Sequence, residues 1–142
     1  MRECVLLFQF EPEKQRKLAA QLLMARFRVK AVTAEEWDLP IGYLAGDKEV
    51  VLDETETEEG PEAKVEDGAG RSPMIVMAGL TGQRVNAVLQ AIRKAGIGPV
   101  PYKAVLTETN RTWKAARLLE ELRKEHEEMS RQEGEGKMLH EQ

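Results

Sequence analysis

The hydrophobic pattern of the first half of the chain predicts a strand, a helix and a second strand. Residues 5–10 form a short apolar run with aromatic and β-branched members, which is typical of a buried strand. Pro12 suits the first turn of a helix, and apolar residues then recur every three or four positions. Polar and apolar residues alternate over 28–33, which predicts a strand. Residues 33–36 have the T-x-x-E spacing of a capping box, so a short helix should follow, and residues 50–52 indicate an edge strand.

The second half repeats the same order of elements. Residues 74–78 are a continuous apolar run and predict a buried strand. A turn at 79–82 leads into an amphipathic helix that Gly96 should stop. Residues 102–107 predict a fourth strand, and a long helix should run from about 110 to 131. The apolar stripe of this helix must cover either the sheet or a second chain, and its far end should project because its apolar content falls.

Two βαβ units in so short a chain predict an α+β fold of the ferredoxin-like type. In this split βαβ sandwich the third strand inserts between the first and second, the helices cover one face of the sheet, and the long C-terminal helix is an addition. A small, fully parallel doubly wound sheet is the alternative. The matching runs Lys30-Ala-Val-Thr33 and Lys103-Ala-Val-Leu-Thr107 also indicate an internal duplication.

The composition of the 142 residues indicates one domain that is interrupted by a polar segment. Residues 53–72 are rich in acidic residues, Gly and Pro and contain a single large apolar residue, so we expect a flexible acidic linker. The first βαβ half is then 1–52, and the second half with its helix is 73–131. Residues 132–142 should form a disordered polar tail.

Length and residue types exclude several function classes. No apolar run approaches the roughly 20 residues that span a bilayer, so we expect no membrane partner. The chain has one cysteine and two histidines, which excludes a disulfide and a Cys- or His-rich metal centre. We therefore expect no metal, no cofactor and no catalytic nucleophile, and a reducing cytoplasm is the expected location.

Charge is distributed unevenly about a net value of −4. Residues 73–117 hold seven basic residues and one acidic residue. With Tyr102 and Trp113 available to stack on bases, this half supports a nucleic-acid-binding alternative. The net negative charge and the neighbouring acidic segment weigh against it.

The run Pro101-Tyr-Lys-Ala-Val-Leu-Thr-Glu-Thr-Asn-Arg-Thr-Trp113 is the most distinctive part of the chain. It is followed by Leu119-Glu-Glu-Leu122 and Lys124-Glu-His-Glu127. With these it resembles a bacterial and archaeal family known as domain of unknown function 3783 (DUF3783). The resemblance covers about residues 73–129 and is looser over the first half, at Leu39-Pro-Ile-Gly-Tyr-Leu-Ala-Gly46.

This resemblance implies a small cytoplasmic prokaryotic protein with no established activity, whose marked residues map to Thr107 and Asn110. These residues and Thr109 lie where the fourth strand meets the long helix, so their side chains should cap its first turn. Together with Lys103 and Arg111 they form a candidate anion-binding site at the positive end of the helix.

A binding or regulatory module is the leading interpretation, because the sequence offers no recognised catalytic grouping. Its ligand would be a small anion or a protein segment at the junction of strand and helix. An enzyme that uses Lys103, Thr107 and Asn110 as polarising groups is a lesser alternative. Homodimerisation is compatible with each interpretation, because a four-stranded sheet leaves two edges to cover.

Overall fold

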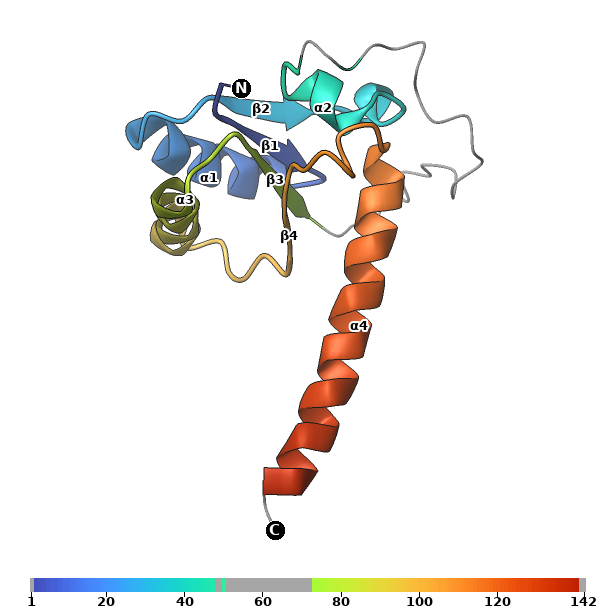
Figure 1. The fold of residues 1–142 in the computed structure, drawn as a ribbon. Helices are drawn as coiled ribbons and strands as arrows, with labels where there is room; N and C mark the ends of the chain where they lie inside the picture. Colours follow the sequence, from blue (N-terminus) through green and yellow to red (C-terminus); the bar gives the residue numbers. More distant parts are fainter. Residues whose placement is uncertain (1, 48–49, 51–72, 141–142) are drawn as a thin grey trace.

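The protein consists of two βαβ units and an added C-terminal helix (Figure 1). The structure, a computed structural model, describes residues 2–47, 50 and 73–140, with side chains described up to residue 128. The predicted α+β class and the C-terminal helix are confirmed. In chain order the elements are β1 (Cys4–Phe8), α1 (Pro12–Met24), β2 (Val29–Val32), the 3-10 helix η1 (Ala34–Glu36), α2 (Ile41–Leu44), β3 (Met74–Ala78), α3 (Gly82–Ala95), β4 (Tyr102–Val105) and α4 (Ala115–His140).

Two predicted segments lie wholly or partly outside the described residues. The acidic linker at 53–72 is one of them. Of the edge strand expected at 50–52, only Val50 is described; it is buried but does not have strand conformation.

The four strands have the order β2-β1-β3-β4. Each βαβ unit is contiguous, since β1 pairs with β2 in parallel and β3 pairs with β4 in parallel. Antiparallel pairing of β1 with β3 joins the two units. The expected insertion of the third strand between the first and second is therefore wrong, and so is the fully parallel alternative. The expected order needs β3 to lie directly beside β2, which a tight hairpin between the two strands would force. Here η1, α2 and a long connection separate β2 from β3 in the chain, so the two strands need not be neighbours in the sheet.

One face of the sheet is covered by α1 and α3, which pack against each other. Val5, Leu7 and Ile75 point into this layer and are fully buried with Leu18 of α1 and Val88 of α3. Each such aliphatic side chain contributes roughly 1.5–3 kcal/mol relative to exposure. The central strands β1 and β3 are buried on both faces, which is why their sequences are continuous apolar runs.

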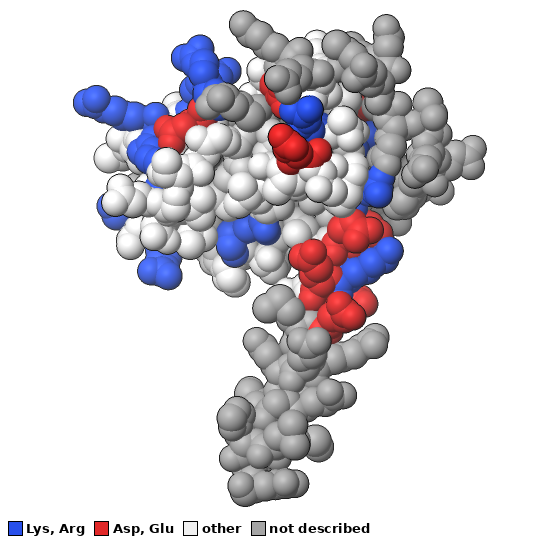
Figure 2. Space-filling view, in the orientation of Figure 1, with Lys and Arg blue, Asp and Glu red and all other residues white. Residues whose placement is uncertain are grey.

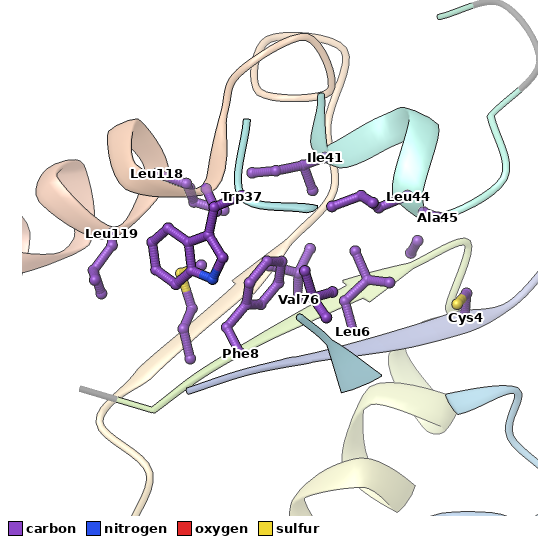
Figure 3. Packing of buried hydrophobic residues seen from close by; sticks show 14 residues of the cluster. Cys4, Leu6, Phe8, Trp37, Ile41, Leu44, Ala45, Val76, Leu118 and Leu119 are labelled. Atoms are coloured by element: carbon purple, nitrogen blue, oxygen red, sulfur yellow. The ribbon is translucent and has the colours of Figure 1, made fainter. Parts of the chain in front are cut away.

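The opposite face is covered by the region from η1 to α2 and by the first turns of α4 (Figure 3). Trp37 lies between Phe8 of β1 and the pair Leu118 and Leu119 of α4. Its ring meets the Phe8 ring edge-on, with the centroids 6.0 Å apart. The expectation that all helices share one face is therefore wrong. The apolar residues of α2 and α4 need a face to bury them, and only this one is left open by α1 and α3.

Arg84, in the first turn of α3, ties the second half to the first. Its guanidinium nitrogens donate to the Glu3 carboxylate, with the shortest contact 2.9 Å, and to the Ala25 carbonyl at 3.2 Å. The same group lies over the Phe27 ring, 3.8 Å from the centroid. Because the planar guanidinium serves all three contacts at once, a lysine would not replace it.

α4 both begins and ends later in the chain than the sequence predicts. The pattern predicts a helix over 110–131 followed by a disordered tail at 132–142, but the helix spans Ala115–His140. Its end extends because Glu, Lys, Met and Leu favour helix, and two glycines at about 1 kcal/mol each do not stop it. As expected, its far part projects away from the body (Figure 1). Among the described residues, no helix is both long and apolar enough to cross a membrane.

Candidate functional site

Asn110 is buried, with 7% of its surface exposed, and it organises residues 106–114, the β4–α4 loop. Its Oδ1 accepts a hydrogen bond from the Thr107 N–H at 2.9 Å, and its Nδ2 donates to the Val105 carbonyl at 3.1 Å. Its own N–H donates to Thr107 Oγ1 at 3.1 Å. The predicted helix N-cap is wrong, because α4 does not begin until Ala115. These polar groups close a turn instead of capping a helix.

The Asn110 carboxamide takes the place of a further strand beside β4. The Leu106 N–H donates to the Met77 carbonyl of β3 at 2.8 Å, so the backbone groups of Val105 and Thr107 face away from the sheet. The amide oxygen and nitrogen of Asn110 pair with those two residues as a neighbouring strand would. The side chain thereby closes this end of the sheet edge.

The first half has a similar arrangement at the end of β2. The Thr33 N–H donates to Glu36 Oε1 at 3.1 Å, and the Thr33 carbonyl accepts from the Glu36 N–H at 3.0 Å. Lys30 Nζ lies 2.9 Å from Glu36 Oε2. The hydrogen bond from Lys30, followed by that from Thr33, holds the pKa of Glu36 below its ordinary value. Thr33 and Thr107 thus occupy equivalent positions, which agrees with an internal duplication, although the duplication stays a prediction.

The β4–α4 loop also supplies hydrogen-bond acceptors for the start of α2. The first N–H groups of a helix have no partner within it. Here the Ile41 N–H donates to the Trp113 carbonyl at 2.9 Å, and the Gly42 N–H donates to the Arg111 carbonyl at 2.7 Å. A Cβ atom on Gly42 would lie 2.8 Å from the Arg111 carbonyl oxygen, closer than packed atoms allow. The two segments that carry the family resemblance therefore meet in one packed unit.

The five predicted ligand residues do not converge. Arg111 Nη1 lies 3.4 Å from Asp47 Oδ2, and Thr109 is exposed. Lys103 Nζ donates to the Val100 carbonyl, which precedes β4, whereas the loop follows β4. A four-residue strand spans about 13 Å, so the Lys103 amine and the loop lie at opposite ends of it. Anion binding at the loop stays a prediction, and so does the enzyme alternative that needs Lys103 beside it.

The two predicted stacking residues make contacts within the protein. The Arg117 guanidinium lies over the Trp113 ring, 4.3 Å from its centroid. Tyr102 meets His126 of α4 edge-on, with the centroids 5.8 Å apart. Both contacts fasten the first half of α4 to the loop and to β4. Base stacking stays a prediction that these contacts do not favour.

The described residues offer little support for metal binding or for a reactive cysteine. No three His, Cys, Asp or Glu side chains there converge as metal ligands. Burial raises the pKa of the Cys4 thiol, against the smaller opposing effects of Arg28 and Lys30. The reactive thiolate form of Cys4 is therefore disfavoured.

Sequence reasoning missed the residues that receive the β4–α4 loop. Proline and glycine usually end a helix, yet here Pro40 directly precedes α2 and Gly42 lies in its first turn. A proline before an apolar stretch is itself a helix-start signal. A glycine inside a helix costs about 0.5–1 kcal/mol relative to alanine, so it indicates a close approach of another segment. Asp47, the partner of Arg111, is singled out by no motif.

Comparison with protein families matches residues 73–129 to a family described as Domain of unknown function (DUF3783). No curated protein and no solved structure matches the chain. The matched segment contains β3, α3, β4, the β4–α4 loop and the first half of α4. It lacks β1 and β2, which complete the sheet, and α2, which receives the loop. The second half of this chain, residues 73–129, therefore resembles the family of unknown function DUF3783.

Proposed function

We propose that the protein is a non-catalytic binding module that presents α4 to a protein partner. The observation that carries this proposal is the way the β4–α4 loop is held. Asn110 engages the loop's own backbone, and the carbonyls of Arg111 and Trp113 engage α2. Because α4 follows directly at Ala115, the same contacts set the direction in which it leaves the body.

The near end of α4 is anchored and its middle is open to a partner. Ala115, Leu118 and Leu119 are buried against the sheet, whereas residues 124–128 are exposed apart from the ring contact of His126 with Tyr102. A helix of 26 residues is about 39 Å long, and much of it stands clear of the body (Figure 1). A polar helix without tertiary contacts is only marginally stable in water. A partner that packs along α4 would therefore supply stability that the body does not.

The exposed part of α4 indicates the chemistry of that partner. Charged side chains of both signs gather on α4 next to the body (Figure 2). Lys124 Nζ lies 3.9 Å from Glu121 Oε1, while Glu125, Glu127 and Glu128 are exposed. A complementary surface would place basic residues opposite Glu125 and Glu128, which lie three positions apart on one side of the helix, with binding that weakens as salt is raised.

Site-specific photo-crosslinking tests the proposal. A photoreactive amino acid replaces Glu125 on α4 and, as the matched control, Lys17 on α1, which is also exposed and helical. In the native host we expect one protein to cross-link from position 125 and not from position 17. That protein, once purified, should bind the intact chain and fail to bind a chain without residues 126–142. Equal cross-linking from both positions, or binding that survives the truncation, would refute the proposal.

A thermal-shift series separates this function from the predicted anion site and from the nucleic-acid alternative. The intact chain is heated with inorganic phosphate, with short oligonucleotides, and with chloride at the same ionic strength. We expect the same midpoint in all three. A ligand present at about 100 times its Kd adds roughly 2.7 kcal/mol to stability. A phosphate-dependent rise of several degrees that Arg111→Ala removes would establish anion binding at the loop instead, and a rise with oligonucleotides alone would favour nucleic acid.

A further inference from the structure

The outer edge of β2 carries a short row of backbone groups that no described residue binds. The Val5 N–H of β1 donates to the Arg28 carbonyl at 2.8 Å, and the parallel register pairs Val5 with Val29. Backbone groups alternate in direction along a strand, so the N–H and C=O groups of Val29 and Ala31 point away from the sheet. The capping box at Thr33 ends this row.

The edge of β4 is closed more completely. Pro101 has no N–H to offer at the start of that edge. At its end the Asn110 side chain holds the Val105 carbonyl and the Thr107 N–H. Lys103 is left as the outward-facing residue of β4 with both backbone groups open, and a charged side chain there discourages pairing. Of the two sheet edges, β2 is therefore the one suited to accept another strand.

The side chains beside the β2 row separate into a basic and an apolar side. Arg28 and Lys30 lie on the face that α2 and α4 cover; Arg28 is exposed, and Lys30 pairs with Glu36. Val29 and Ala31 lie on the other face, where Val29 packs against the core and Ala31 is exposed. An added strand would direct alternate side chains to these two sides. Acidic residues would meet Arg28, whose neighbour Lys30 is already paired with Glu36, and small or β-branched residues would meet Val29 and Ala31.

We propose that the β2 edge binds an extended peptide of a partner protein by strand addition, and that this peptide alternates acidic residues with Thr, Val or Ala. Main-chain hydrogen bonds to Val29 and Ala31 supply the binding, and the exposed Arg28 selects for acidic side chains. The surface is separate from α4, so this proposal stands or falls independently of the proposed function.

Fluorescence anisotropy with the intact chain tests strand addition. The probe is a labelled peptide, Asp-Glu-Thr-Glu-Thr-Glu-Glu, which has the sequence of residues 53–59 and the required alternation. We expect saturable binding that weakens at least tenfold in Ala31→Pro and is unchanged in Lys103→Pro, the matched change at the β4 edge. Both substitutions remove an outward-facing N–H, so neither breaks a bond of the sheet. N-methylation of alternate peptide amides should abolish binding too, which keeps the test decisive if Ala31→Pro does not fold.

The same assay identifies other occupants of the edge. A second receptor protein, the intact chain with Glu54→Gln, Glu56→Gln and Glu58→Gln, is tested beside the unaltered chain. Binding to this receptor but not to the unaltered chain would assign the edge to the chain's own segment and overturn the proposal. A chain that is dimeric in light scattering and becomes monomeric in Ala31→Pro would assign the edge to a second copy, with the same consequence. Absence of binding to both receptors, or equal loss in Ala31→Pro and Lys103→Pro, also overturns it.

Discussion

Replacing Asn110 with alanine removes the side chain that closes the β4–α4 loop. The substitution deletes hydrogen bonds of 2.9 Å to the Thr107 N–H and 3.1 Å to the Val105 carbonyl. A net contribution of about 0.5–1.5 kcal/mol for each bond gives a loss of about 1–3 kcal/mol. The lower part of this range applies if water reaches the two freed backbone groups, which face outward from the sheet. Asn110→Asp keeps the acceptor for Thr107 but sets a carboxylate oxygen against the Val105 carbonyl in a buried position, so its loss at neutral pH should be at least as large as that of alanine.

Urea unfolding followed by circular dichroism measures these losses as changes in the free energy of unfolding. The matched control is Thr109→Ala, an exposed position in the same loop, which should stay within about 0.5 kcal/mol of the unaltered chain. In thermal unfolding, a loss of 2 kcal/mol should lower the midpoint by roughly 5–8 °C in a chain of this size. A change below about 0.5 kcal/mol in Asn110→Ala would mean that the carboxamide does not hold the loop, and the account of how α4 is aimed would be refuted with it.

Two further predictions concern α2 and the capping box. Gly42→Ala should lower the free energy of unfolding by about 1–3 kcal/mol, because the new Cβ would lie 2.8 Å from the Arg111 carbonyl oxygen. Gly82→Ala, whose Cβ would meet nothing within 4 Å, is the control and should be neutral or slightly stabilising in the same urea titration. The pKa of Glu36 is lowered chiefly by Lys30, so its contribution is present above the ordinary pKa of a glutamate and is lost as pH falls through the lowered value. Unfolding measured from pH 7 to pH 3 should therefore lose less stability in Glu36→Gln than in the unaltered chain, and parallel pH curves would contradict this.

The match to residues 73–129 also bears on how the family segment is stabilised. In this chain β3 is covered on both faces and pairs along both edges, with β1 on one side and β4 on the other. β1, from the first half, pairs with the inner edge of β3. The β4–α4 loop, from the second half, accepts hydrogen bonds from the N–H groups of α2. Residues 73–129 are therefore stabilised in this chain partly by contacts with its first half.

The sequence determined the local elements because their signals are local. A continuous apolar run predicts a strand that is buried on both faces, as β1 and β3 are. The stop at Gly96 is confirmed, since this residue has a left-handed backbone conformation with φ of 66°. The capping-box spacing at Thr33 is confirmed in that the Glu36 carboxylate accepts from the Thr33 N–H, while the Glu36 N–H donates to the Thr33 carbonyl. Each of these features depends on residues within four positions of one another.

Tertiary structure alone decided the strand order, the layer in which α4 packs and the role of Asn110. Spacing in the sequence cannot show which strand lies beside β1, because several pairings satisfy the same apolar pattern. Asn110 and its neighbours read as a helix N-cap, since Asn and Thr before an amphipathic stretch usually are one. The loop carbonyls instead bind α2, which is some 70 residues earlier in the chain, and this contact delays the start of α4. Contacts between segments so distant leave no periodic trace in the sequence, and only the folded chain brings them together.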